Sequence, residues 1–243
     1  MADISSRTQL LLGSEGVARL QSAHVLVVGL GGVGGYAAEQ LCRAGIGRMT
    51  IVDGDTVSPT NINRQLIALH STVGQPKALL FRDRFRDINP QCQITALQEF
   101  LRDDRMIQLL QSAHFDCVVD CIDTLSPKVF LLYHARCLGL PVVSSMGSGG
   151  KLDPAQVRTA DISKSNTCRL AAMVRKRLHR MGVTQGIRVV FSTEPVPPEA
   201  MTEDPSANHL TTVGTISYMP PLFGCHLAAE VIRILLDNTD NQQ

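Results

Sequence analysis

The stretch HVLVVGLGGVG, residues 24–34, decides the fold. Its first part, HVLVVG (24–29), is a short apolar run that predicts a buried β-strand, and GVGGYAAEQLCRAG (32–45) predicts the helix that follows. Between strand and helix lies a G-x-G-x-x-G sequence with the glycines Gly29, Gly31, Gly32 and Gly34. Glycines at such a turn let backbone N–H groups approach a phosphate at the positive end of the helix. The stretch therefore predicts a nucleotide-binding βαβ unit, although glycines that only permit tight packing are an alternative.

The alternation of apolar runs and helical stretches continues along the chain. Further strands are predicted over 48–53, 92–98, 115–121 and 141–147. The helices between them are predicted over 76–88, over 103–112 and up to about 138. Strands separated by helices are typical of a mostly parallel sheet. We therefore expect an α/β, Rossmann-like fold in which residues 1–150 form the ATP-binding, adenylating region.

The pattern changes beyond Gly150. Strands are predicted over 156–161 and 187–192, a basic helix over 168–182, a proline-rich loop over 194–209 and a last helix over 220–237. We expect residues 151–243 to be a C-terminal extension that covers the end of the sheet and belongs to the same domain.

Composition sets the broad class of the protein. The 243 residues are 44% hydrophobic and 19% charged, with a net charge of +1, which fits a globular enzyme and leaves any basic patch local. The seven cysteines include no C-x-x-C pair, so neither a zinc clip nor a redox dithiol is predicted, and Cys225 is expected to be a buried packing residue. The N-terminus does not resemble a signal peptide, and no run of about 18 residues is apolar throughout, so we expect no membrane association and a cytoplasmic location.

An acidic residue follows the second strand at the position that suits a ribose. Asp53 ends the run 48–53, about twenty residues beyond the glycine motif, where a carboxylate can accept hydrogen bonds from ribose hydroxyls. The glycine motif and this acid do not distinguish NAD from ATP.

Cations in the next segment favour ATP. Arg64 lies in TNINRQ (60–65) and Lys77 in QPK (75–77), beyond the acid pair Asp53 and Asp55. Cations there can offset the charge that develops on the α-phosphoryl group and the leaving pyrophosphate. The arginine suits bidentate contact and the lysine a point charge. Both cations could instead be solvated surface residues.

A second pair of acids follows the strand FDCVVDC (115–121). Strand ends in an open α/β sheet border the ligand crevice, so Asp123 is a candidate for a hydrated magnesium ion that bridges phosphates, with Asp120 a second candidate. Asp123 could also cap the helix that begins near residue 124.

Five motifs in order, GLGGVG, VDGDTV, TNINRQ, VGQPK and VDCID, resemble the adenylating domain of the ubiquitin-activating-enzyme superfamily. Bacterial branches of that superfamily activate sulfur-carrier proteins. The resemblance implies that ATP and magnesium are the cofactors and that Arg64, Lys77 and Asp123 are catalytic, with Asp123 on the metal. The implied ATP contacts comprise the four glycines together with Asp53, Asp55, Asn61, Arg64, Gln65, Lys77 and, from near the N-terminus, Arg7. A solvated tail residue is the alternative for Arg7.

Motifs in the second half resemble the tRNA threonylcarbamoyladenosine dehydratase family. They are MGSGGKLDP (146–154), DISKS (161–165), VVFSTEP (189–195) and GTISYMPPLFG (214–224). The resemblance implies ATP-dependent cyclisation of threonylcarbamoyladenosine beside the anticodon of tRNA, through adenylation of the threonyl carboxylate and release of AMP. It also implies a homodimer. The alternative is an adenylyltransferase that activates the C-terminus of a ubiquitin-like sulfur carrier; a catalytically idle adapter and an NAD-dependent dehydrogenase are more distant rivals.

The helix predicted over 168–182 is strongly basic. Its expected apolar stripe consists of Leu170, Val174, Leu178 and Met181. The opposite side would then present Arg169, Arg175, Lys176, Arg177, His179 and Arg180. We expect this side to contact the phosphate backbone of tRNA, with a solvated helix face as the alternative.

Overall fold

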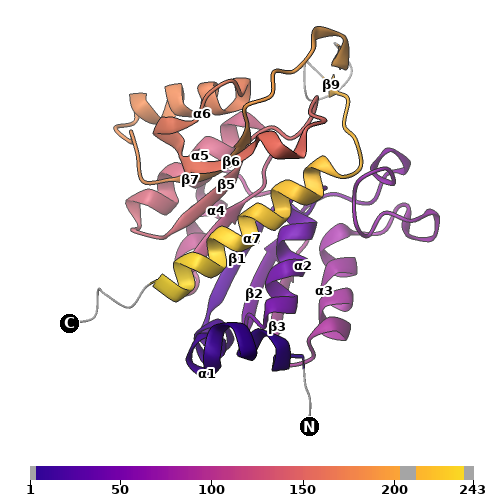
Figure 1. Ribbon diagram of the computed structural model, residues 1–243, viewed down its shortest axis with the longest axis vertical. Coiled ribbons are helices and arrows are strands. Elements are labelled where there is room, and N and C mark those ends of the chain that lie inside the picture. Colours follow the sequence, from indigo (N-terminus) through magenta and orange to yellow (C-terminus); the bar gives the residue numbers. More distant parts are fainter. Residues whose placement is uncertain (1–3, 203–211, 238–243) are drawn as a thin grey trace.

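The computed structural model describes residues 4–202 and 212–237 (Figure 1). Its centre is a seven-stranded sheet of order β3-β2-β1-β4-β5-β7-β6. All neighbouring strands run parallel except β6 and β7, which are antiparallel. The strands are β1 (His24–Val28), β2 (Arg48–Val52), β3 (Gln93–Leu97), β4 (Cys117–Asp120), β5 (Val142–Ser145), β6 (Val157–Asp161) and β7 (Arg188–Ser192). The predicted α/β, Rossmann-like class is confirmed.

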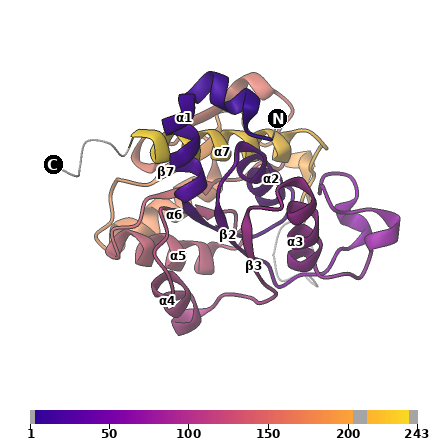
Figure 2. The same ribbon diagram turned by 90° about the horizontal axis from the view of Figure 1, so that it is seen from below.

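Helices cover both faces of the sheet, as the views in Figures 1 and 2 show. One layer contains α1 (Ser6–Ser22), α2 (Gly34–Ala44), α3 (Lys77–Ile88) and α7 (Met219–Asp237). The other layer contains α4 (Asp103–Gln111), α5 (Leu125–Cys137) and α6 (Arg169–Arg180). Each layer buries its own apolar cluster against the sheet, which explains why strands β1 and β4 are hydrophobic on both sides.

The strands and helices predicted up to residue 150 are present, with ends that differ by a few residues. Helix α1 was not predicted. The segment 194–209 was expected to be a loop, yet it contributes β8 (Met201–Thr202), which pairs with β9 (Thr212–Val213) in a two-stranded antiparallel sheet. The rest of that predicted loop, from residue 203 onward, lies outside the described residues.

The second half of the chain extends the sheet of the first half. Strand β7 pairs with β5, and β6 closes the edge beyond it. Helix α7 then crosses the face of the sheet opposite to α6 and packs on α2 and on β4, β5 and β7. Residues 151–243 therefore contribute strands and a core helix to the sheet that residues 1–150 begin.

Helix α7 packs against the sheet as a core helix, with Met219, Phe223 and Val231 buried, although its length and composition would also suit a membrane span. Its orientation corrects the prediction for Cys225. Cys225, which was expected to be buried, lies on the exposed side of this helix. The prediction was wrong because an apolar run does not show which side of the helix faces the sheet.

The turn from β1 into α2 is the tightest part of the fold. Gly29 has φ = 90°, a left-handed backbone that an L side chain rarely adopts, and a Cβ there would lie 2.8 Å from the Cys121 carbonyl oxygen. A Cβ at Gly34 would overlap the Gly29 carbonyl oxygen. By contrast, a Cβ at Gly31 would meet nothing closer than the Gln65 amide nitrogen at 3.6 Å. Glycine is thus a steric requirement at both ends of the motif, and the space beside Gly31 is open.

A fully buried ion pair joins β4, β5 and α5. The Lys128 ammonium lies 2.6 Å from a carboxylate oxygen of Asp120, and both side chains are inaccessible to solvent. The same carboxylate oxygen accepts a hydrogen bond from the Ser144 hydroxyl, and its other oxygen accepts one from the Ile122 N–H. Lys128 also donates to the Ile122 carbonyl at 2.8 Å. The network therefore holds the residues that follow β4 against the first turn of α5.

We expect Gly34→Ala to prevent stable folding, because its methyl group would overlap backbone that cannot move without separating α2 from β1. The loss should reach at least about 3 kcal/mol. Gly31→Ala is the matched control, since its methyl group would make only ordinary van der Waals contact, and it should change the free energy of unfolding by less than about 1 kcal/mol. Urea unfolding followed by circular dichroism measures both; equal stability of the two variants would contradict the steric argument.

Lys128→Met should reduce the free energy of unfolding by about 3–5 kcal/mol, because it leaves the Asp120 carboxylate buried without its counter-charge. The double variant Asp120→Asn/Lys128→Met removes both charges and should recover much of that loss. Urea unfolding of the single and double variants checks this. A double variant no more stable than the single variant would show that the pairing of charge does not govern stability here.

Candidate functional site

The candidate site lies where the order of the strands reverses. The chain proceeds from β1 outward to β2 and β3, then returns to place β4 on the other side of β1. The turns that leave these two neighbouring strands meet, since a Cβ at Gly29 or Gly34 would contact Cys121. Such a reversal at the carboxyl ends of parallel strands leaves a crevice in which ligands bind.

Asp53 connects the end of β2 to the glycine turn. One carboxylate oxygen accepts a hydrogen bond from the Leu30 N–H at 2.6 Å, and the other accepts one from the Asp55 N–H at 2.8 Å. Burial raises the pKa of Asp53, while the positive charge of Lys77 and these two N–H groups oppose the shift. Each oxygen retains a lone pair, so the carboxylate can still accept hydrogen bonds from ribose hydroxyls.

Lys77 is buried beside the same acids. It is the first residue of α3, and only 4% of it is exposed. Its backbone N–H donates to the Asp55 carbonyl, and its ammonium lies 3.0 Å from an Asp55 carboxylate oxygen. A bridge between Thr56 and Pro76 brings the two segments together. The polar segment between Asp55 and Lys77 thus closes on itself and places the ammonium next to Asp53 and Asp55.

Arg64 lies over the glycine turn from the other side. A Cβ at Gly32 would lie 3.3 Å from Arg64 Cγ. The guanidinium donates to the Thr60 carbonyl and to Asn63 Oδ1, both at 2.9 Å. Burial lowers the pKa of Arg64, and the negative charge of Asp123 opposes that shift. The arginine therefore lies against the glycine turn and near enough to the acid that follows β4 to be affected by its charge.

Asn61 shapes the short turn that carries Arg64. Its side-chain oxygen accepts a hydrogen bond from the Ser58 N–H, and its carbonyl accepts hydrogen bonds from the N–H groups of Arg64 and Gln65. Only 9% of Asn61 is exposed. Its contacts in the structure are those of a residue that orients its neighbours.

Gln65 has an unpaired buried acceptor, and its amide group lies beside the same turn. Its Oε1 is the buried side-chain polar atom without a hydrogen-bond partner among the described residues. The amide nitrogen lies 3.6 Å from the Cβ position of Gly31, where the glycine turn is open. Buried polar groups are almost always paired, so an orphaned acceptor beside an open glycine turn indicates a site for a ligand with a hydrogen-bond donor.

The structure brings most of the predicted site residues together around one turn. They are Gly29, Gly31, Gly32, Gly34, Asp53, Asp55, Asn61, Arg64, Gln65, Lys77 and Asp123. It does not place Arg7 with them. This exposed residue begins α1, and α1 ends at the amino ends of the strands, where Leu20 and Ala23 accept hydrogen bonds from Gly47 and Arg48 (Figure 1).

Lys128 was not predicted to have a role, and the prediction for Asp120 was wrong. Asp120 was a second candidate for a metal or phosphate ligand, but it is fully buried and bonded to Lys128, Ser144 and Ile122. The available signal was the lysine in LSPKVFLL (125–132), one charge in an otherwise apolar stretch of helix. A single cation at such a position needs an acid of opposite charge nearby.

The donor set at the site fits a metal ion that arrives with a nucleotide. The described residues include no group of three or more histidines, cysteines or acids that could hold a metal ion by themselves. Magnesium usually takes only one or two protein carboxylates and fills its other positions with water and phosphate oxygens. A single acid whose charge acts on Arg64, such as Asp123, meets that requirement.

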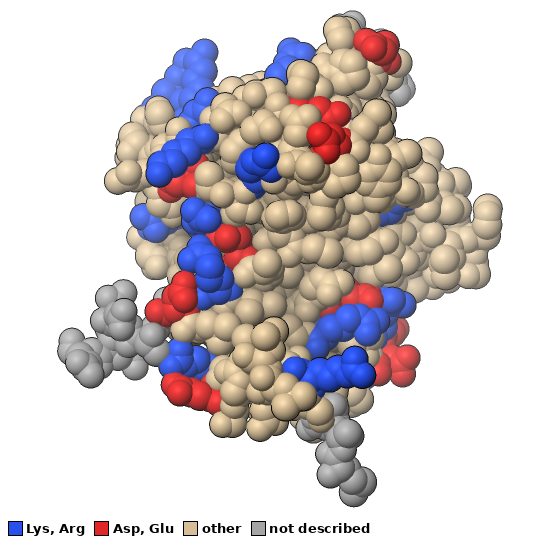
Figure 3. Space-filling view, viewed as in Figure 1, with Lys and Arg blue, Asp and Glu red and all other residues tan. Residues whose placement is uncertain are grey.

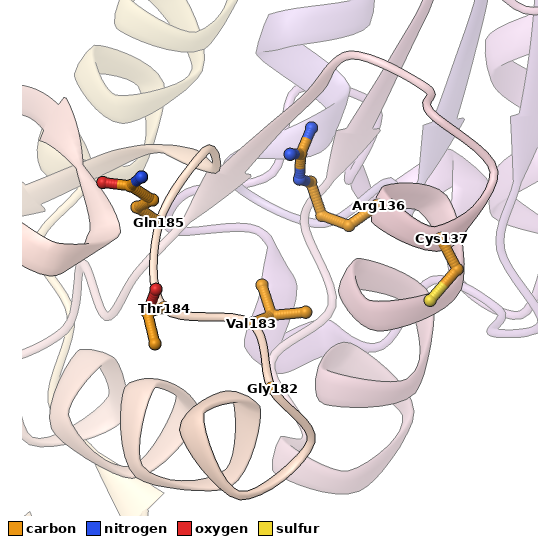
Figure 4. A pocket seen from close by; sticks show the side chains of 6 residues that line it. All are labelled: Arg136, Cys137, Gly182, Val183, Thr184 and Gln185. Atoms are coloured by element: carbon orange, nitrogen blue, oxygen red, sulfur yellow. The ribbon is translucent and has the colours of Figure 1, made fainter.

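A separate hollow lies at the other end of α5. It has a volume of about 250 Å³ and is lined by Arg136, Cys137 and residues 182–185, with side chains from the end of α5 facing the loop that follows α6 (Figure 4). None of these residues belongs to the glycine turn or to the segment 53–77. The hollow is therefore distinct from the candidate nucleotide site.

Comparison with known proteins identifies the family of this chain. The model of the ThiF family matches residues 5–243. The tRNA threonylcarbamoyladenosine dehydratase of Bacillus subtilis (strain 168) is 44% identical over 189 residues, which are 78% of this chain and 74% of the relative. That of Escherichia coli (strain K12) is 40% identical over 194 residues, 77% of this chain and 72% of the relative.

A solved structure extends the likeness to the whole fold. The crystal structure of E. coli tRNA N6-threonylcarbamoyladenosine dehydratase in complex with ATP superposes with a TM-score of 0.87 at 33% identity. The match covers 98% of this chain and 95% of that chain. The chain belongs to the ThiF family and, within it, to the tRNA threonylcarbamoyladenosine dehydratases.

Proposed function

We propose that this protein uses ATP to cyclise threonylcarbamoyladenosine beside the anticodon of tRNA. One observation carries the proposal. The half-buried Arg64 contacts the glycine turn at Gly32, and the buried Lys77 lies beside Asp53, which accepts a hydrogen bond from the same turn. This is the arrangement needed to bind a nucleoside triphosphate and to stabilise charge that develops at its α-phosphate. The names of the relatives at 40–44% identity support the choice of carboxylate substrate.

The first step is adenylation of the threonyl carboxylate. A carboxylate oxygen attacks the α-phosphorus of ATP, the bond to the β-phosphate oxygen breaks, and pyrophosphate leaves. Asp53 holds the ribose, and the backbone of the glycine turn lies against the phosphates. Arg64 and Lys77 offset the negative charge on the α-phosphoryl group and on the leaving pyrophosphate. Gln65 accepts a hydrogen bond from the bound nucleotide, which satisfies its orphaned oxygen.

The second step closes the ring. A nitrogen of the neighbouring carbamoyl group attacks the activated carbonyl carbon, the carbon–oxygen bond to the phosphate breaks, AMP leaves and the nitrogen loses its proton. The nucleoside thereby loses the elements of water. Because nucleophile and electrophile belong to one residue of the substrate, proximity supplies much of the rate and no protein nucleophile is required. The exposed Cys225 on α7 has no part in this scheme.

Three further features belong to the proposal. Asp123 would hold a magnesium ion that arrives with ATP, because it follows β4 and its negative charge acts on Arg64. The protein works as a homodimer. Its place of action is the cytoplasm, where tRNA and ATP are available.

The decisive experiment follows ATP cleavage with defined tRNA substrates. With tRNA that carries threonylcarbamoyladenosine, we expect AMP and pyrophosphate to form in equal amounts, matched by the cyclic nucleoside in a digest analysed by mass spectrometry. Unmodified tRNA of the same sequence should give only background cleavage. Equal turnover with both tRNAs would contradict the proposal. Pyrophosphate release stimulated by a ubiquitin-like sulfur carrier and indifferent to tRNA would support the alternative activation of a carrier protein.

Replacement of Gln65 tests whether its free acceptor belongs to the nucleotide site. Gln65→Leu keeps a similar volume and removes an unpaired buried oxygen, so the protein without ligand should be as stable as the wild type or slightly more stable. Affinity for ATP should fall about 5- to 30-fold, which corresponds to roughly 1–2 kcal/mol for a lost hydrogen bond. Calorimetry with ATP and thermal unfolding without it measure the two effects. Unchanged ATP affinity would show that the oxygen does not face the nucleotide.

A further inference from the structure

The charges of this protein are strongly segregated along the chain. Seven of the 23 Lys and Arg residues, and none of the 22 Asp and Glu residues, lie in the segment 162–193. This segment therefore carries a charge of +7, whereas the rest of the chain carries −6, and only their sum is near zero. A segregation of this kind creates a local positive field that the net charge of the protein does not reveal.

Helix α6 orders that charge in space. Its buried side consists of Ala171, Val174 and Leu178, which pack into the apolar cluster shared with α5. The structure corrects the predicted stripe, because Met181 follows the helix and is 40% exposed. The residues directly opposite the buried side, given about 3.6 residues per turn, are Arg169, Lys176 and Arg180, and all three are exposed. We refer to these three residues as the α6 basic face.

The cations on the flanks of α6 are engaged within the protein. Arg175 donates to the carbonyl and hydroxyl of Ser165, and Arg177 donates to the Ser126 hydroxyl on α5. No ion pair among the described residues involves the α6 basic face. Lys and Arg side chains gather at the upper left of the surface in Figure 3, where Figure 1 places α6. The positive charge of the α6 basic face is therefore available to a partner.

The first turn of α6 lies near the candidate site. A Cβ at Gly147, just after β5, would lie 3.8 Å from the sulfur of Cys168, which precedes the helix. Strand β5 pairs with β4, and neighbouring strands are about 4.8 Å apart. The loop that carries Asp123 and the loop beside α6 are therefore adjacent at the carboxyl ends of these two strands.

We propose that the α6 basic face binds the phosphate backbone of the tRNA whose modified adenosine enters the glycine-turn site; this inference rests on the proposed function. Three exposed cations along about 18 Å of helix can each replace a counterion on a polyanion. Such contacts position the RNA without reading its sequence, and the substrate is then selected at the site itself. Aromatic residues are only 4% of the chain, which agrees with recognition by charge and not by extensive base stacking.

The test compares two double variants that remove the same charge from different faces. Lys176→Ala/Arg180→Ala alters the α6 basic face, and Arg82→Ala/Arg86→Ala removes two cations from α3 as the matched control. An unmodified tRNA transcript labelled with a fluorophore serves as the probe, titrated by anisotropy between about 50 and 200 mM salt. The α6 variant should bind at least about tenfold more weakly, with the slope of log affinity against log salt smaller by about 1.5, whereas the α3 variant should match the wild type.

Kinetics and a charge-preserving variant separate docking from folding. With modified tRNA, the α6 variant should raise KM for tRNA at least about fivefold and leave kcat and KM for ATP unchanged. Lys176→Arg/Arg180→Lys should restore most of the affinity, because the charge and not the side-chain shape is required. Wild-type affinity and salt slope in the α6 variant would overturn the proposal. The proposal would also be overturned if the α6 variant no longer bound anionic lipid vesicles but still bound tRNA as the wild type does.

The two proposals can fail separately. If the protein does not cyclise modified tRNA, the anisotropy experiment still shows whether the α6 basic face binds RNA. If the α6 variant binds tRNA as the wild type does, the assay of AMP and cyclic nucleoside still reports on the chemistry.

Discussion

Close approach of backbone at the β1–α2 turn is the constraint on which the rest of the structure depends. A side chain at Gly34 would overlap the Gly29 carbonyl, and one at Gly29 would press on Cys121. With glycine at both positions, α2 packs directly on the sheet, and the turn after β4 lies against the turn after β1. The same closeness exposes backbone N–H groups at the start of α2, where a phosphate is favoured. One steric condition thus serves packing and nucleotide binding together.

The buried pair of Asp120 and Lys128 supports the other side of this crevice. Ion pairs inside a protein often contribute little net stability, because both charges must leave water. Here the pair is joined to Ser144 and to both backbone groups of Ile122, so every strong donor and acceptor has a partner. The main effect of the ion pair is to fix the position of the backbone at Ile122, immediately before Asp123. The pair thereby helps to position that acid, whose negative charge acts on Arg64.

Charge is distributed so that each part of the protein meets a different part of the substrate. Lys77 is buried and Arg64 is half-buried, and both lie near acids, which suits groups that act on one bound nucleotide. The α6 basic face is exposed and lacks acids nearby in the sequence, which suits a long polyanion held at many points. The near-zero net charge of the protein does not reveal these two separate groups of cations.

The sequence by itself determined the β1–α2 unit, the order of strands and helices, and the residues that gather at the glycine turn. Those features depend on local periodicity and on glycines placed between a strand and a helix, and both are visible along the chain. Only the tertiary structure decided which side chains are buried and with what partner. It paired Lys128 with Asp120, left Gln65 with a free acceptor, exposed Cys225 and placed Arg7 away from the site. These outcomes depend on contacts between residues far apart in sequence, and an apolar run or a lone charge does not specify which distant element it will meet.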